Sequence, residues 1–224
     1  MDAASPPRYS LGWMIPEQLL TFDAGAGPSL QGALTLAPGA SCGVVVCHPH
    51  PQYGGDMHSH VVAAAVRACV EVGLGTLRFN FRGVGASGGA WDEGRGEQDD
   101  VRAAVAHLRG LLGPSARVAL AGYSFGATMA AAVAAAGEPL AGLALIAPPL
   151  AMRGLPGSPV AVEGPLLIVA GRRDPYCPVS AVAGLARAWP AATVTTIDGA
   201  DHFFAGAVDA LHAALADWAT KLPR

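Results

Sequence analysis

One serine of this chain lies in a segment that can make it a nucleophile. Residues 122–126 read Gly-Tyr-Ser-Phe-Gly, between a strand-like run at 117–121 and a helix-like run at 127–136. A sharp, strained turn between strand and helix presents a serine hydroxyl at the positive end of the helix, and it needs small residues two positions away on each side. Gly122 and Gly126 meet that need, so Ser124 is the candidate nucleophile.

Two later residues can supply the base and the acid that an activated serine needs. His202 follows a strand-like run at 194–197, and Asp174 follows an apolar run at 166–170. The order serine, aspartate, histidine along the chain is the one expected with this kind of elbow. His202 would take the proton of Ser124, while Asp174 would fix the tautomer of His202 and stabilise the imidazolium. The alternative is that Ser124 caps a helix and Asp174 makes a turn, which requires three strand ends to coincide by chance.

Further residues compete for these roles. Asp201 is adjacent to His202, but neighbours in a turn seldom face each other, and Asp198 is a weaker option. Cys177 lies three positions after Asp174 but has no glycine-flanked elbow, so we expect it to pack near the acid rather than to act as a nucleophile. Asp174 therefore remains the preferred acid.

The rest of the chain alternates between strand-like and helix-like segments. Strands are expected at 19–22, 30–36, 44–47, 76–81, 117–121, 140–146, 166–170 and 193–197. Helices are expected at 58–72, 97–112, 127–136, 179–189 and 206–222. Such alternation with short connections predicts an α/β protein with a mostly parallel central sheet covered by helices on both faces.

This order also predicts where the site lies. The candidate serine, aspartate and histidine all fall at the carboxyl ends of strands, where ligands bind in such sheets. The strands at 19–22 and 30–36 are expected to be edge strands around a Gly/Pro turn. We expect an N-terminal lead-in at 1–16 and a single domain at 17–224.

The composition favours one domain with a sizeable core and disfavours several classes of partner. The chain has 224 residues, of which 52% are apolar and 14% charged, and its formal net charge is −3. This balance argues against nucleic acid and anionic membranes as partners. Residues 118–137 are uncharged, but the elbow glycines and serine within them fit a strand-to-helix change better than a membrane span.

Two features predict a cytoplasmic protein. The first residues of the chain lack the basic and apolar regions of a secretory signal. The cysteines form no Cys-x-x-Cys pair, and we interpret them as buried thiols in a reducing compartment. They are Cys42, Cys47, Cys69 and Cys177.

Over nearly its whole length the chain resembles the α/β-hydrolase family, and most of all its small bacterial members without a cap. Motifs at 47–55, 80–87, 122–126 and 199–204 carry the resemblance. It implies the α/β-hydrolase fold, with no cap domain, because the connection at 151–164 is too short for the helical cap that many relatives insert there. Since this fold supports many chemistries, the motifs do not specify a substrate.

The resemblance also implies an oxyanion hole built from two backbone N–H groups. One is that of the residue after the nucleophile, Phe125. The other belongs to the segment after the strand at 44–47, where two prolines have no N–H to donate. His50, Gln52 and Tyr53 remain, and His50 is preferred because it stands where relatives have the last residue of a His-Gly-X motif. The alternative is that this segment is only a rigid proline turn.

Neighbouring polar residues leave other interpretations open. Four histidines could bind zinc, but their spacing is not that of a metallo-hydrolase and no set of acids accompanies them. We expect the first of them to order its loop and the last two to start a helix; they are His48, His50, His58 and His60. Arg82, in a glycine-rich loop without phosphate-loop spacing, is expected to pair with a carboxylate. Arg153, Arg172 and Arg173 would favour an anionic substrate or are solvated surface charges.

These observations predict a serine hydrolase of the carboxylesterase type that cleaves short acyl esters of small molecules through an acyl-enzyme, without cofactor or metal. Thioesterase, lactonase and amidase activities use the same machinery and stay open. A metal-dependent hydrolase and a non-catalytic binding protein are the rivals, and the oligomeric state is not specified. Candidates for contact with the substrate are Gln52, Tyr53, Tyr123 and Phe203.

Overall fold

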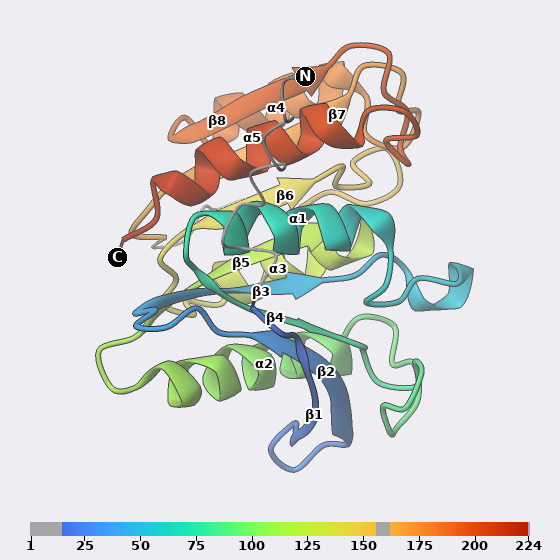
Figure 1. Cartoon of the computed structure of the whole chain (residues 1–224). Coiled ribbons are helices and arrows are strands. Elements are labelled where there is room, and N and C mark those ends of the chain that lie inside the picture. The colour runs from blue at the N-terminus through green and yellow to red at the C-terminus, as the bar shows by residue number, and fades with distance from the viewer. Residues whose placement is uncertain (1–14, 156–161, 224) are drawn as a thin grey trace, which may run out of the picture.

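The central element of the structure is an eight-stranded sheet with the order β1-β2-β4-β3-β5-β6-β7-β8 (Figure 1). The structure is a computed structural model that describes residues 15–155 and 162–223. Pairing is antiparallel between β1 and β2 and between β2 and β4, and parallel between all other neighbours. The mostly parallel α/β sheet expected from the sequence is confirmed, whereas most of the expected lead-in at 1–16 lies outside the described residues.

The strands and helices fall close to their expected positions. The strands are β1 (Gln18–Asp23), β2 (Ser29–Thr35), β3 (Cys42–Cys47), β4 (Gly75–Phe79), β5 (Arg117–Tyr123), β6 (Leu143–Ile146), β7 (Leu166–Gly171) and β8 (Ala192–Ile197). The helices are α1 (His60–Glu71), α2 (Gly96–Leu112), α3 (Phe125–Ala135), α4 (Val179–Ala188) and α5 (Val208–Thr220), with a short 3-10 turn η2 (Pro51–Tyr53).

Two expectations about strands were wrong. β2 is not an edge strand, because it pairs with β1 on one side and with β4 on the other. The strand expected at 140–146 begins only at Leu143, and Leu140 makes an isolated bridge to Val162 instead. An apolar run shows that a segment is buried, but it does not show which of its residues have a neighbouring strand to pair with.

The helices cover both faces of the sheet, and two apolar clusters result. In β3, Val44 and Val46 belong to the cluster that includes α1 and α5, whereas Val45 and Cys47 belong to the cluster that includes α2 and α3. This alternation follows from the pleat, which directs successive side chains to opposite faces. α1 and α5 are in contact with each other, as are α2 and α3, and α4 contacts β7 and β8 (Figure 1).

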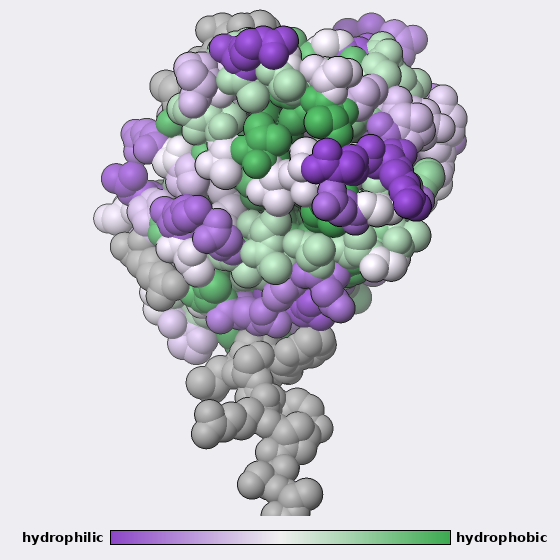
Figure 2. Space-filling view, turned by 90° about the horizontal axis from the view of Figure 1, so that it is seen from above, coloured by the Kyte–Doolittle hydropathy of each residue, from purple (hydrophilic) through white to green (hydrophobic). Residues whose placement is uncertain are grey.

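The two edges of the sheet are β1 and β8. Most residues of β8 are exposed or half-buried, and three of its six residues are threonines. Figure 2 shows the molecule of Figure 1 from above, with hydrophilic residues interspersed among smaller hydrophobic patches. Polar side chains of this kind on an edge strand disfavour pairing with another chain.

No separate domain covers the carboxyl end of the sheet in the described part of the chain. The connection from β6 to β7 contains no helix in its described part, and residues 156–161 lie outside that part. Within residues 15–155 and 162–223, no helix combines the length and the hydrophobicity needed to cross a bilayer.

A buried histidine holds the ends of β3 and β4 together. His48 follows β3 and is fully buried, and its Nε2 accepts a hydrogen bond of 3.0 Å from the N–H of Phe81. Its Nδ1 lies 2.6 Å from the carbonyl oxygen of Pro49 and must therefore carry the proton. Burial lowers the pKa of His48 from 6.5 to about 4, so the ring is neutral near pH 7. The expectation that His48 orders its loop is confirmed.

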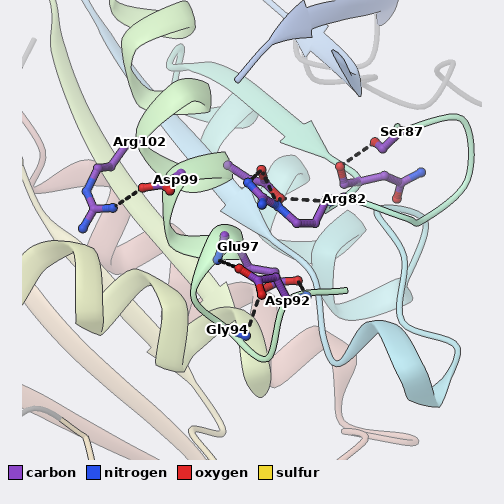
Figure 3. A network of polar contacts seen from close by, with 10 residues as sticks. Arg82, Ser87, Asp92, Gly94, Glu97, Asp99 and Arg102 are labelled. Atoms are coloured by element: carbon purple, nitrogen blue, oxygen red, sulfur yellow. Dashed lines mark hydrogen bonds and ion pairs between the residues drawn. The ribbon is translucent and has the colours of Figure 1, made fainter. Parts of the chain in front are cut away.

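A polar network fixes the long loop between β4 and α2 (Figure 3). Arg82 donates through Nη2 to Asp100 Oδ1 at 2.7 Å, and its backbone N–H donates to Asp100 Oδ2 at 3.0 Å. Asp100 is fully buried, and the expected pairing of Arg82 with a carboxylate is confirmed. The buried Glu97 accepts from the N–H groups of Asp92 and Gly94, each at 2.8 Å. Both carboxylates come from α2, so this helix holds the loop that precedes it.

Replacing His48 should remove part of the dependence of stability on pH. Because the pKa is lower in the folded state than in the unfolded chain, the unfolded state binds more protons between pH 6.5 and about 4. Wild type should lose roughly 3 kcal/mol of stability from this group as the pH falls through that window. His48→Gln cannot titrate, so the stability difference between wild type and variant, measured by urea unfolding, should shrink as pH falls. A constant difference would contradict the assignment of a buried neutral ring.

Removing Asp100 should destabilise the fold much more than removing its neighbour. Asp100→Ala leaves Arg82 without its buried partner, which typically costs about 3–5 kcal/mol. Asp99→Ala removes an exposed pair with Arg102 at 2.7 Å, which is worth less than about 1 kcal/mol. Urea unfolding of both variants measures the contrast, and equal losses would show that the Arg82 pair does not hold the loop.

Candidate active site

The turn after β5 has the geometry of a nucleophile elbow. Ser124 has φ 54° and ψ −113°, an unfavourable conformation for a residue with a side chain. Its N–H donates to the carbonyl of Ile146 at 2.8 Å, which ties the turn to β6. A Cβ added to Gly122 would lie 2.3 Å from the carbonyl oxygen of Gly126, and one added to Gly126 would lie 2.3 Å from that of Cys47. The sequence requirement for two glycines is therefore a requirement for close backbone contact.

The structure brings the three chemically interesting residues together. His202 Nε2 lies 3.0 Å from Ser124 Oγ, and His202 Nδ1 lies 2.7 Å from Asp174 Oδ2. A carboxylate accepts hydrogen bonds, so a neutral imidazole here carries its proton on Nδ1 and presents Nε2 as an acceptor to the serine hydroxyl. Asp174 and His202 are both buried, while Ser124 is partly exposed. This arrangement can transfer the serine proton to the imidazole.

The orientation of Asp174 is set by the turn after β7. Its Oδ1 accepts from the N–H groups of Tyr176 at 2.8 Å and Cys177 at 2.9 Å, which leaves Oδ2 for the imidazole. Cys177 itself is fully buried, as expected, and burial raises its pKa to about 12. The competing acids have other partners: Asp198 pairs with Arg172, and Asp201 accepts from two backbone N–H groups.

Contacts from distant elements hold the loop that carries His202. The hydroxyl of Tyr123, the residue before the serine, donates to the carbonyl of His202 at 3.0 Å. At the start of α1, His60 Nε2 donates to the carbonyl of Phe203 at 2.7 Å. The ring of Tyr176 meets the imidazole of His202 edge-on at 4.9 Å. The base is thus fixed by β5, α1 and the turn after β7 together.

Among the hydrogen bonds between described residues, two backbone N–H groups near the serine find no acceptor. The N–H groups of Gln52 and Tyr53 are used, because they donate to Nδ1 and to the carbonyl of His50. Within the described part of the chain, no hydrogen bond uses the N–H of His50. Phe125 is the first residue of α3, so its N–H has no acceptor within the helix.

A cleft of about 1300 Å³ opens above Ser124, and it is lined by residues from the connections after six strands, β3 to β8, together with residues of α1, α2 and α3. Of the residues expected to contact a substrate, Tyr53, Tyr123 and Phe203 line this cleft. Gln52 is exposed and does not line the cleft. It lies in η2, and its N–H donates to Nδ1 of His50. The structure therefore does not support the expected contact of Gln52 with a substrate.

Aromatic residues form one wall of the cleft, and sequence reasoning missed part of it. The imidazole of His50 lies 4.7 Å from the ring of Trp91 and 5.0 Å from that of Phe125. Tyr176 and Met152 also line the cleft and are exposed. The only feature of the sequence that could have indicated Trp91 as part of this wall is the presence of a tryptophan in a polar, glycine-rich loop. The loop conformation that directs Trp91 to the cleft depends on the buried Glu97, which no local pattern indicates.

The remaining histidines have structural roles that the geometry explains. Both ring nitrogens of His48 face backbone groups, and His60 donates to the loop of His202. Ser59 is the N-cap of α1, so His58 and His60 lie at its start, as expected. Across the described ranges, no group of three or more His, Cys, Asp or Glu side chains is arranged to hold a metal ion.

Comparisons with known proteins agree with this geometry. XC6422 from Xanthomonas campestris, described as an α/β serine hydrolase without lid, is 34% identical with a TM-score of 0.81, over 93% of this chain and 96% of that one. An α/β serine hydrolase homologue from Coxiella burnetii is 33% identical with a TM-score of 0.79, over 90% and 96%. The uncharacterized protein RP471 of Rickettsia prowazekii is 43% identical over 99 residues.

The match to RP471 spans 44% of this chain and 41% of that relative's length. The two solved structures, in contrast, align along nearly the whole chain. The family model of the alpha/beta hydrolase domain matches residues 44–214, which include the elbow, the carboxylate turn and the histidine loop. The chain thus belongs to the alpha/beta hydrolase family, and its fold is that of the members without a lid.

Proposed function

We propose that this protein is a serine hydrolase that cleaves short acyl esters of small molecules. The observation that carries the proposal is the chain of contacts from Asp174 through His202 to Ser124, at 2.7 and 3.0 Å, on a strained elbow. This arrangement has no evident structural purpose, because the strain at Ser124 costs free energy that a plain turn would not. A cleft with an aromatic wall opens directly onto the serine.

In the first half of the proposed reaction, Ser124 Oγ attacks the ester carbonyl while His202 Nε2 takes the hydroxyl proton. The carbonyl oxygen becomes an oxyanion, which the N–H groups of Phe125 and His50 stabilise. The tetrahedral intermediate then collapses: the bond to the leaving alkoxide breaks, and His202 gives it the proton. Asp174 stays ionised and stabilises the imidazolium throughout.

In the second half, water takes the place of the alcohol. His202 removes a proton from water, the hydroxide attacks the acyl-enzyme carbonyl, and the same N–H groups stabilise the second oxyanion. Collapse breaks the bond to Ser124 Oγ, and His202 returns the proton to the serine. The open cleft gives water direct access to this step.

The support for esters comes from the shape of the cleft. No cap is formed by the described residues around it, and the exposed side chains of Tyr53, Met152, Tyr176 and Phe203 line it. A small ester with an apolar acyl chain fits such a surface without interfacial activation. Thioesters, lactones and amides would use the same residues, so a panel of matched substrates decides among them.

The cytoplasm remains the proposed location. The four cysteines are buried and unpaired thiols, as expected in a reducing compartment. In the described fold, none of the four cysteines forms a disulfide.

A fluorophosphonate probe should label wild type and not Ser124→Ala. The probe reacts with a serine whose hydroxyl is activated by a base, so labelling lost in the variant reports an activated Ser124. Labelling should be unaffected by EDTA. A folded wild type that stays unlabelled would contradict an activated serine, and loss of labelling with EDTA would favour a metal-dependent enzyme.

Replacing the carboxylate should lower ester turnover with little change in fold. Asp174→Asn lets the wrong tautomer of His202 form, and kcat should fall roughly 10³- to 10⁴-fold. Asp198→Asn is the matched control, because that carboxylate pairs with Arg172 rather than with His202, and its kcat should match wild type. Steady-state hydrolysis of a 4-nitrophenyl ester measures both, with circular dichroism to verify folding. Equal effects of the two variants would contradict the role of Asp174.

A further inference from the structure

A positively charged side chain reaches across one wall of the cleft. Arg153 follows β6 and lines the cleft, and its side chain is exposed. Its Nη1 lies 3.6 Å from the position that a Cβ would occupy at Gly94, in the loop between β4 and α2. The sulfur of Met129, on α3, lies 3.6 Å from the same position. In the sheet, β3 and β5 lie between β4 and β6. Because Arg153 follows β6 and its guanidinium lies near the loop after β4, the side chain extends across the α3 side of the cleft.

The carboxylates beside Arg153 are engaged elsewhere. Glu97 accepts two backbone N–H groups of the loop, and Glu93 pairs with Arg95 at 3.0 Å. The ion pairs formed between described residues do not include Arg153. Both charges act on His50: burial lowers its pKa most, Glu97 raises it, and Arg153 lowers it by a smaller amount. The cleft therefore holds a cation available to a ligand.

The proposed reaction gives the two sides of the cleft different roles. His202 must protonate the leaving group, so the alcohol half lies on the side of His202, Phe203 and the start of α1. α1 and α3 belong to opposite faces of the sheet. The acyl half then extends toward the α3 side, where Thr128 and Arg153 line the cleft.

We propose that Arg153 selects esters whose acyl half carries a carboxylate, such as half-esters of short dicarboxylic acids. This inference rests on the proposed function and adds the substrate class. A guanidinium binds a carboxylate through two parallel charge-assisted hydrogen bonds, which give both affinity and orientation. Binding at the far end of the acyl chain holds the ester carbonyl against Ser124 and the two N–H groups.

Two ethyl esters of equal acyl length provide the test. Monoethyl glutarate carries a terminal carboxylate where ethyl pentanoate carries a methyl group. Wild type should hydrolyse the glutarate with the higher kcat/KM, measured by ethanol release. Arg153→Gln should lower the ratio of the two kcat/KM values roughly 10- to 100-fold, as expected for loss of hydrogen bonds to a charged group. Arg153→Lys should retain part of the preference, because it keeps the charge but not the planar fork.

Two controls separate the proposal from general charge effects. Arg187→Gln removes an exposed positive charge from α4, outside the cleft lining, and should leave the ratio as in wild type. The acetate ester of 4-hydroxybenzoate places the carboxylate on the leaving group, and its turnover relative to phenyl acetate should not depend on Arg153.

The outcomes distinguish failure of this inference from failure of the proposed function. Hydrolysis of ethyl pentanoate with no preference for the glutarate would overturn the inference and leave the esterase intact. A ratio that drops equally in Arg187→Gln would overturn it too, as would an Arg153 dependence seen only with the hydroxybenzoate ester. Absence of all ester turnover together with an unlabelled Ser124 would overturn the proposed function, and the inference with it.

Discussion

The site depends on how closely three backbone segments approach one another at Ser124. The end of β5, the start of α3 and the end of β3 come so near that neither Gly122 nor Gly126 has room for a Cβ. This contact forces the serine into a positive φ, and it also brings the segment after β3, with the N–H of His50, beside the start of α3. The candidate nucleophile and the proposed oxyanion donors are thus placed by one packing constraint and not by separate devices.

The sequence predicted the parts of the site that depend on local pattern. An elbow needs small residues at fixed spacing between a strand and a helix, so its position could be found from Gly122 and Gly126 together with the runs that flank them. Parallel strands bring their carboxyl ends to the same edge of the sheet. The competing acids could be ranked because a residue adjacent to His202 cannot easily face it. The ends and neighbours of strands were harder to predict from the sequence, because hydrophobic runs indicate burial and not pairing. For this reason Leu140 was expected in β6, and β2 was expected at the edge of the sheet.

The parts that the sequence could not predict are contacts between distant loops. Nothing near Glu97 indicates that its carboxylate binds the N–H groups of Asp92 and Gly94, and that pairing decides where Trp91 and Gly94 lie. Arg153 was one of several arginines with two interpretations, and only the fold separates them: Arg172 pairs with Asp198, while Arg153 reaches Gly94. The sequence gives little indication of where the charged end of a long, flexible side chain will lie.

The bond from the Tyr123 hydroxyl to the carbonyl of His202 has a consequence for motion. His202 follows β8, an edge strand with a neighbour on only one side, and edge strands open more readily than central ones. Tyr123 belongs to β5, in the middle of the sheet, and directly precedes the serine. The hydrogen bond therefore anchors the loop of His202 to a central strand, which should keep the distance between His202 and Ser124 steady when the edge of the sheet opens.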